Sequence, residues 1–139
     1  MIEFNYREEL LKTGEFIIRP VAKVSLLRSD DEWIAEYFYI DSGADYTLMP
    51  YRMGKFLGLE KIATEVRDIG GIGGIIAVRL ATIPMKIEKY QFDCTIGWAQ
   101  IERVPFLLGR QDVFVHFDIT FQQRLKKQFL HGINNINNP

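Results

Sequence analysis

An acid, a hydroxyl and a second acid lie within five consecutive positions, where residues 41–45 read Asp-Ser-Gly-Ala-Asp. Residues 33–40, directly before them, are mostly apolar and aromatic and predict a strand that runs into this segment. A carboxylate at the end of a buried strand is costly unless it is paired or hydrogen-bonded. Asp41 is therefore a candidate for acid–base chemistry, although this segment alone is better explained by an aspartate that caps a turn before Pro50.

A cluster of four glycines around one apolar residue, at residues 70–74, is the second unusual feature. Strands are expected on both sides of this cluster, so it predicts the tip of a β-hairpin. Each glycine costs about 0.5–1 kcal/mol of ordering relative to alanine, and a purely structural turn needs only one or two of them. Four glycines favour a hairpin that opens and closes over a ligand, and a loose surface turn is the alternative.

Other chemistries find little support in the sequence. The glycine cluster has Ile76 where a dinucleotide-binding loop has its third glycine, and a strand rather than a helix follows it. Gly54-Lys55 is not followed by the serine or threonine of a phosphate-binding loop. His116 and His131 lack the spacing of zinc ligands, so a zinc site would need mostly carboxylates. We therefore expect neither a metal nor a cofactor.

Composition narrows the class of protein further. The chain has 139 residues, 47% of them hydrophobic and 25% charged, which is typical of one globular domain with its own core. A net charge of -1 removes the basic footprint of a nucleic-acid binder. No apolar run approaches the roughly 18 residues of a membrane span, and the N-terminus has no signal core. The single cysteine, Cys94, favours a reducing compartment, so we expect a cytoplasmic protein.

We predict a single, mostly-β domain over residues 1–139, with a core over about 16–131 and a flexible tail over 132–139. Two short helices are expected, one over residues 50–57 that ends at Gly58 and one over 109–116. Cys94 alternates with apolar neighbours on one strand face, which indicates a small core residue rather than a nucleophile. Besides 33–40, the expected strands cover residues 16–27 with Pro20 at an edge or start, residues 62–69, one strand after the glycine cluster, one around Cys94, and a final hairpin of 117–123 and 125–130.

A third segment, Leu107-Leu108-Gly109-Arg110, completes a pattern with the acidic segment and the glycine cluster. In this order, the three segments resemble those of the retropepsins, the retroviral-type aspartic proteases. Residues 41–45 resemble the catalytic Asp-Thr/Ser-Gly-Ala signature with its following acid, and residues 69–74 are similar to the flap of immunodeficiency-virus proteases. Residues 107–110 resemble the segment that opens the C-terminal helix of these enzymes. The resemblance spans about residues 16–115, and Arg19-Pro20 before a valine-rich strand also matches.

Three departures from the family pattern bear on the function. Ser42 stands in place of the threonine that is commoner in the family. It keeps the hydroxyl and loses a methyl group that would pack where the two subunits of a retropepsin dimer meet. Tyr46 occupies a position that is often acidic in immunodeficiency-virus proteases, which affects the expected substrate preference. Residues 1–15 and the hairpin over 117–130 exceed the minimal viral enzyme, whose chain ends help hold its dimer together. The contacts between subunits can therefore differ here.

The resemblance implies a retropepsin half-barrel with a flap hairpin, assembled as a homodimer. Aspartic proteases use two carboxylates that share one proton: one activates a water, and the other polarises the scissile carbonyl. This chain carries one such motif in about half the length of a two-lobed enzyme, so a two-fold dimer would supply the partner's Asp41. Two carboxylates about 3 Å apart repel by roughly 5 kcal/mol at an effective dielectric constant of 20, so one proton is retained. Activity is then expected at mildly acidic pH.

The resemblance also assigns roles to single residues. Ser42 would hydrogen-bond across the dimer base, and the Gly43 carbonyl would receive the substrate backbone. Asp45 would pair with Arg110 of the same chain and with the partner's Arg19. The substrate-binding residues implied are Ala44, Asp45, Tyr39, Leu48, Ile69, Gly70, Gly71, Ile72, Pro105 and Leu107. Tyr39 and Leu107 are equally acceptable as plain core residues.

The function expected from these residues is that of a homodimeric aspartic endopeptidase that cuts peptides at apolar sites. A catalytically idle peptide-binding or dimerisation module of the same fold is the alternative, and such a module has no need of a shared proton. A small-ligand β-barrel binder is a third hypothesis, for which a monomer is expected.

Overall fold

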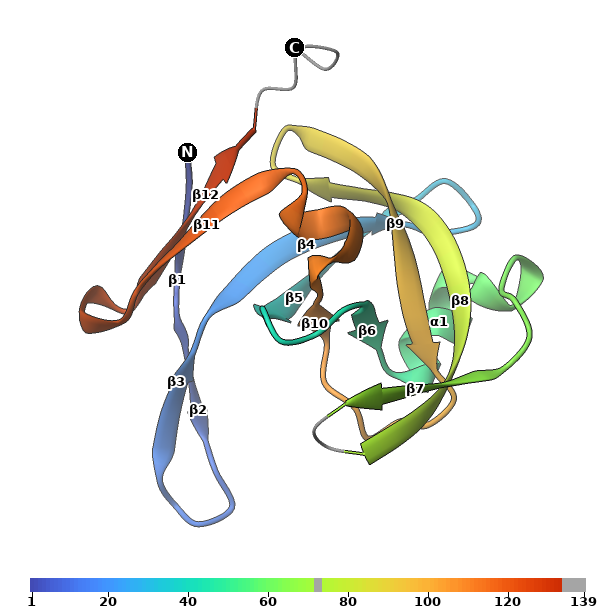
Figure 1. The fold of residues 1–139 in the computed structure, drawn as a ribbon, viewed down its shortest axis with the longest axis horizontal. Helices are drawn as coiled ribbons and strands as arrows, with labels where there is room; N and C mark the ends of the chain where they lie inside the picture. The colour runs from blue at the N-terminus through green and yellow to red at the C-terminus, as the bar shows by residue number, and fades with distance from the viewer. Residues whose placement is uncertain (72–73, 134–139) are drawn as a thin grey trace.

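The computed structural model describes residues 1–71 and 74–133, which form a mostly β structure (Figure 1). No helix in this part of the chain is long and apolar enough to cross a membrane. The helical elements are α1 (Tyr51–Leu57) and the short turns η1 (Leu59–Lys61), η2 (Arg110–Phe114) and η3 (Gln123–Leu125). The strands are β1 (Ile2–Asn5), β2 (Arg7–Leu10), β3 (Phe16–Arg19), β4 (Val21–Leu27), β5 (Trp33–Ile40), β6 (Thr47–Met49), β7 (Arg67–Gly71), β8 (Gly74–Ile87), β9 (Tyr90–Ala99), β10 (Leu107–Leu108), β11 (Phe117–Gln122) and β12 (Lys127–Gly132).

Seven strands form one sheet in the order β4-β5-β10-β6-β9-β8-β7. β4 also pairs with β8, through Ser25 opposite Lys86 and Leu26 opposite Met85, so the sheet closes on itself and leaves β7 outside the ring. The core side chains fill the ring, and Phe38, Leu108 and Cys94 are among those with no exposed surface. Closure of this kind removes exposed strand edges, which would otherwise pair with other chains.

Helix α1 packs closely against β9 because a glycine faces a tryptophan. A Cβ atom at Gly54 would overlap the Trp98 indole ring, and the Trp98 Nε1–H donates a hydrogen bond to the Tyr51 carbonyl oxygen at 2.9 Å. The helix ends as predicted at Gly58, which has a φ of 79°. The predicted strand over 33–40 is also confirmed residue for residue.

The short strand β10 lies between β5 and β6 and connects the two halves of the ring. It runs parallel to β5, with Leu107 opposite Tyr39 and Leu108 opposite Ile40, and antiparallel to β6, with Leu107 opposite Leu48. Because β5 and β6 are joined by residues 41–46, this insertion places that loop directly beside the end of β10. The register of two residues in β10 thus determines where the acidic segment lies.

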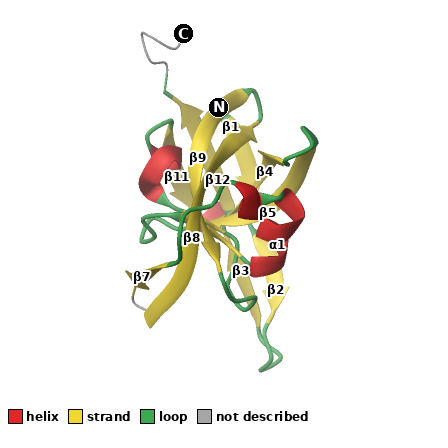
Figure 2. Ribbon diagram, turned by 90° about the vertical axis from the view of Figure 1, so that its right-hand side faces the viewer, coloured by secondary structure: helices red, strands yellow, loops and turns green. Residues whose placement is uncertain are grey.

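Strands from the two ends of the described chain pair with each other. β1 and β11 lie on either side of β12 in a three-stranded sheet, and both Ile2 and Ile119 are opposite Leu130. The predicted C-terminal hairpin is present, but its second strand begins at Lys127 rather than at residue 125, because Gln123–Leu125 form the turn η3, and it extends to Gly132. Residues 134–139 of the predicted tail lie outside the described residues. β2 and β3 form a separate hairpin that projects from the body (Figures 1 and 2).

Further predicted elements are wrong in detail. The predicted strand over 16–27 is two strands, because Pro20, which has no N–H to donate, separates β3, paired with β2, from β4, paired with β5 and β8. Residues 62–66 do not belong to a strand, because β7 begins only at Arg67. The predicted helix over 109–116 is broken, because Gln111 is extended and Asp112 has a φ of 66°. The Asp112 side chain stabilises this conformation, since its Oδ2 accepts a hydrogen bond from the Thr95 N–H at 2.8 Å. A helix through this segment would withdraw that carboxylate from β9.

The Cys94 thiol is expected to be unreactive in the folded protein. Its side chain has no exposed surface, and burial raises its pKa to about 12. At pH 8 the thiolate, which is the reactive form, would then make up roughly one part in ten thousand. A chromogenic thiol reagent should label Cys94 at pH 8 only after denaturant is added. Prompt labelling of the native chain would contradict this expectation.

Candidate active site

Asp41 follows β5 and begins a tight turn. Its backbone N–H donates to the Leu108 carbonyl oxygen at 3.1 Å, which fixes the end of β5 against β10. One carboxylate oxygen, Oδ1, accepts a hydrogen bond from the Gly43 N–H at 2.9 Å, and the Ala44 N–H donates to the Asp41 carbonyl oxygen at 3.2 Å. A Cβ atom at Gly43 would lie 3.3 Å from that carboxylate oxygen, so a side chain there would crowd the acid.

Residues 41–46 are held in place by hydrogen bonds from the residues that follow β10. The Arg110 and Gln111 N–H groups donate to the carbonyl oxygens of Ala44 and Asp45, each at 2.9 Å. The Gly109 N–H donates to the buried Thr47 Oγ1 at 3.2 Å. Sequence analysis did not identify Thr47, because a single threonine in an apolar segment gives no signal of such a bond.

Asp45 and Arg110 form an ion pair within the chain, as the resemblance implied. Their side chains are 70% and 57% exposed, respectively, so the pair is open to water. Exposed pairs of this kind contribute about 0–1 kcal/mol to stability. Its effect is therefore local: it links the acidic segment to η2 and leaves both charges accessible to a further partner.

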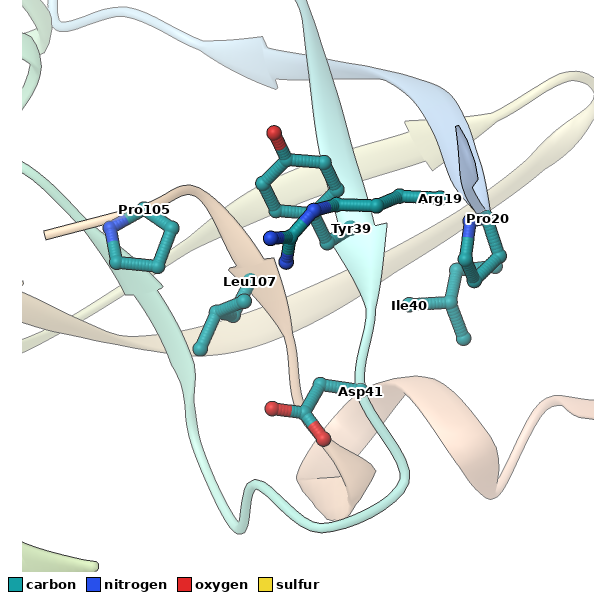
Figure 3. A pocket seen from close by; sticks show the side chains of 7 residues that line it. All are labelled: Arg19, Pro20, Tyr39, Ile40, Asp41, Pro105 and Leu107. Atoms are coloured by element: carbon teal, nitrogen blue, oxygen red, sulfur yellow. The ribbon is translucent and has the colours of Figure 1, made fainter. Parts of the chain in front are cut away.

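Two pockets adjoin Asp41, and this residue lines both. The larger, of about 520 Å³, lies between residues 41–46 and the β7–β8 hairpin. The smaller, of about 310 Å³, lies on the other side of Leu107 and is drawn in Figure 3. The larger pocket is lined by Asp41, Gly43, Ala44, Asp45, Tyr46, Leu48, Ile69, Gly70, Gly74, Ile76 and Leu107. The smaller is lined by Arg19, Pro20, Tyr39, Ile40, Asp41, Pro105 and Leu107.

Most of the residues singled out from the sequence thus meet around one acid. Ser42 is exposed and is not among the residues that line either pocket, and Gly71 is paired with Gly74 at the end of the hairpin. Ile72 lies outside the described residues. Pocket-lining residues to which the sequence had assigned no role in substrate binding are Ile76, Pro20 and Ile40. Ile76 had a usable signal, because it lies directly opposite Ile69 in the hairpin.

The β7–β8 hairpin, which we call the glycine hairpin, covers one side of the larger pocket. Gly74 has a φ of 113°, a conformation that other residues rarely adopt, and it needs glycine for that reason. A Cβ atom at Gly70 or Gly74 would meet no atom of the described residues within 4 Å, so there is open space beside both glycines. Among the described residues, no group of three or more histidine, cysteine, aspartate or glutamate side chains could hold a metal ion.

Comparison with solved structures identifies the fold. A retropepsin-like aspartic protease from Rickettsia conorii aligns with 92% of this chain and 98% of its own, at 16% sequence identity and a TM-score of 0.60. The EIAV protease complexed with the inhibitor HBY-793 aligns with 70% of this chain and 86% of its own, at 21% identity and a TM-score of 0.52. No protein-family model and no curated protein matches the sequence. The chain has the retropepsin-like fold that its three motifs predict.

Proposed function

We propose that the protein is a homodimeric aspartic endopeptidase. The observation that carries this proposal is the position of Asp41, whose carboxylate accepts a hydrogen bond from the Gly43 N–H and lines two adjoining pockets. A partly buried carboxylate beside a pocket with the apolar side chains of Leu48, Ile69 and Ile76 is costly for a protein that only binds apolar peptides. Two proteins of the same fold are proteases by name, which supports this reaction class by analogy.

The second carboxylate would come from another copy of the chain. The reaction needs two acids, and one chain supplies one at this position. A two-fold axis beside Asp41 would bring in the partner's Asp41. Ser42 is exposed next to it, and the open Asp45–Arg110 pair offers a charged contact for the partner's Arg19. These polar groups support a subunit contact around the acidic segment.

The two acids would hold one proton between them. The ionised carboxylate takes a proton from a water as the water oxygen attacks the scissile carbonyl carbon, while the protonated carboxyl gives its proton to the carbonyl oxygen. In the next step the C–N bond breaks, the departing nitrogen takes a proton from one carboxyl, and a hydroxyl of the tetrahedral intermediate returns a proton to the other. The pair ends with one proton, ready for another cycle.

The substrate would be an extended peptide lying between residues 41–46 and the glycine hairpin. A peptide in this conformation presents alternate side chains to opposite sides, which suits two pockets that share Asp41 and Leu107. The larger pocket offers the apolar side chains of Leu48, Ile69 and Ile76. Ile72 and its neighbouring amides would close over the peptide, and the open space around the hairpin glycines supports such a movement.

The experiment that tests this function is cleavage of a peptide library with apolar residues around the scissile bond, at pH 4–6, followed by mass spectrometry. We expect cleavage that a statine-type inhibitor blocks, and a specific activity that rises with chain concentration, because only the dimer is active. Sedimentation of the active species should give twice 16.2 kDa. Peptide binding without cleavage would instead indicate an idle module of the same fold, and full activity from a monomer would overturn the shared-proton mechanism.

A further inference from the structure

The hairpin of β2 and β3, which we call the N-terminal hairpin, carries charged side chains to the smaller pocket. Its strands pair so that Arg7 lies directly opposite Arg19. Like charges in that position repel each other, so the hairpin alone does not favour this arrangement. Glu9, on the same strand face as Arg7, offsets the repulsion, since its carboxylate lies 3.9 Å from the Arg19 Nε.

Tyr39 of β5 is the side chain on which these charges converge. The guanidinium carbons of Arg7 and Arg19 lie 5.5 and 5.4 Å from the centre of its ring. The Tyr39 hydroxyl donates a hydrogen bond to the Glu9 carboxylate and accepts one from Arg7 Nη2 at 3.3 Å. Burial, and after it the bond to Glu9, raises the pKa of Tyr39, so the phenol remains a donor at all pH values where activity is expected.

The same tyrosine forms a wall of the smaller pocket. Tyr39 and Asp41 are two residues apart, and both line this pocket. Figure 3 shows the Tyr39 ring at one end of the pocket, with the Arg19 side chain passing across it, and Asp41 at the other end. Leu107, Pro105, Pro20 and Ile40 also line the pocket. Any rotation of the Tyr39 ring therefore changes the size of the pocket next to the acid.

We infer that Glu9 is a positioning residue that sets substrate preference, because its carboxylate holds the Tyr39 ring as the wall of a pocket for a bulky apolar side chain. The N-terminal hairpin is then part of the specificity site. This inference rests on the proposed function for its substrate, a peptide with a large apolar residue beside the scissile bond. It adds a contact from residues 1–15, which lie outside the segment that resembles the viral enzymes.

The test compares Glu9→Ala, Glu9→Gln, Tyr39→Phe and the double variant Glu9→Ala/Tyr39→Phe with wild type. The readout is the ratio of kcat/KM for two peptides that differ only in phenylalanine or alanine beside the scissile bond, a ratio that is independent of the amount of active dimer. Loss of a hydrogen bond to a charged group is expected to lower this ratio about 3- to 10-fold in Glu9→Ala and in Tyr39→Phe. The double variant should lose no more than either single one, and Glu9→Gln, which keeps a carbonyl acceptor, should retain most of the preference.

Glu8→Ala is the matched control, because Glu8 directly precedes Glu9 on β2, is exposed, and points to the opposite face. Its ratio should equal that of wild type. The affinities of the same two peptides for each variant are also measured by calorimetry, with Asp41→Asn added to every chain so that no peptide is cleaved. Cleavage whose preference is the same in Glu9→Ala as in Glu8→Ala would overturn the inference and leave the proposed function intact. If wild type does not cleave the peptides, and Glu9→Ala alters the preference with which they bind, the inference stands and the proposed function is overturned. If no peptide binds, both are overturned.

Discussion

Replacing Asp41 with asparagine is expected to lower kcat/KM for peptide cleavage by about 10⁴-fold or more, since the change removes both acids of a dimer at once. The amide oxygen of the introduced asparagine can still accept the hydrogen bond from the Gly43 N–H, so the geometry of the turn should be preserved. An amide cannot take a proton from water or deliver one to a departing nitrogen. Rates are measured by mass spectrometry with the best peptide from the library at pH 4–6.

A mixing experiment gives this prediction its control. Asp41→Asn chains added in excess to wild type should lower the activity further than the same excess of an unrelated protein does, because mixed dimers hold only one of the two carboxylates. Thermal unfolding of the variant should match that of wild type, which excludes a loss of fold. Cleavage at the wild-type rate by Asp41→Asn would show that Asp41 is not the acid.

Gly109→Ala is expected to destabilise the fold by about 3 kcal/mol or more. A Cβ atom at this position would overlap the backbone C and O atoms of Tyr46 and lie 2.8 Å from its N. Because the neighbour is backbone rather than a flexible side chain, residues 41–46 must shift away from β10 for the methyl group to fit. Urea unfolding measures the change, and the midpoint of thermal unfolding should fall by roughly 10 °C.

Gly70→Ala is the matched substitution. A Cβ at Gly70 meets nothing within 4 Å, and the residue does not have a positive φ. The free energy of unfolding should therefore change by less than about 1 kcal/mol. Equal losses in the two variants would mean that the close approach of Gly109 to Tyr46 is not what restricts position 109.

Elements whose signals lie within a few residues could be predicted from the sequence. Pro50 and Gly58 bracket α1, and the β5 strand is a continuous apolar and aromatic segment between a polar turn and an acid. The β7–β8 hairpin was predictable for the same reason, since strand-forming residues flank the glycines on both sides. In each case local backbone preference and the tertiary fold favour the same conformation.

Elements that depend on distant partners could not be predicted. Ile62 and Val66 look like strand residues, yet they are 56% and 59% exposed, and no sheet neighbour covers them among the described residues. Asp112 adopts a positive φ because of a bond to Thr95, seventeen residues earlier, which no pattern around 109–116 reveals. The hydrophobic pattern of a segment indicates which of its residues tend to be buried, but it does not indicate which other part of the fold is available to cover them.

The contacts of the candidate site likewise divide into those that the sequence predicts and those that depend on distant partners. Family resemblance was sufficient to associate Asp41 with the glycine cluster and with Leu107, because these segments keep their order along the chain. The contact between Glu9 and Tyr39 joins residues thirty apart, in a hairpin that the resemblance does not cover. Such a contact follows only from the way β2 and β3 lie across the end of β5.

The pairing of the chain ends has a consequence for how activity would be controlled. β1 and β11 already occupy both edges of β12, so its backbone groups are bonded before any second subunit arrives. We expect each polypeptide to fold without a second copy. Association is then a separate equilibrium that depends on the concentration of the chain. Newly synthesised molecules would then remain latent while scarce, and accumulation or recruitment to a common scaffold would switch them on.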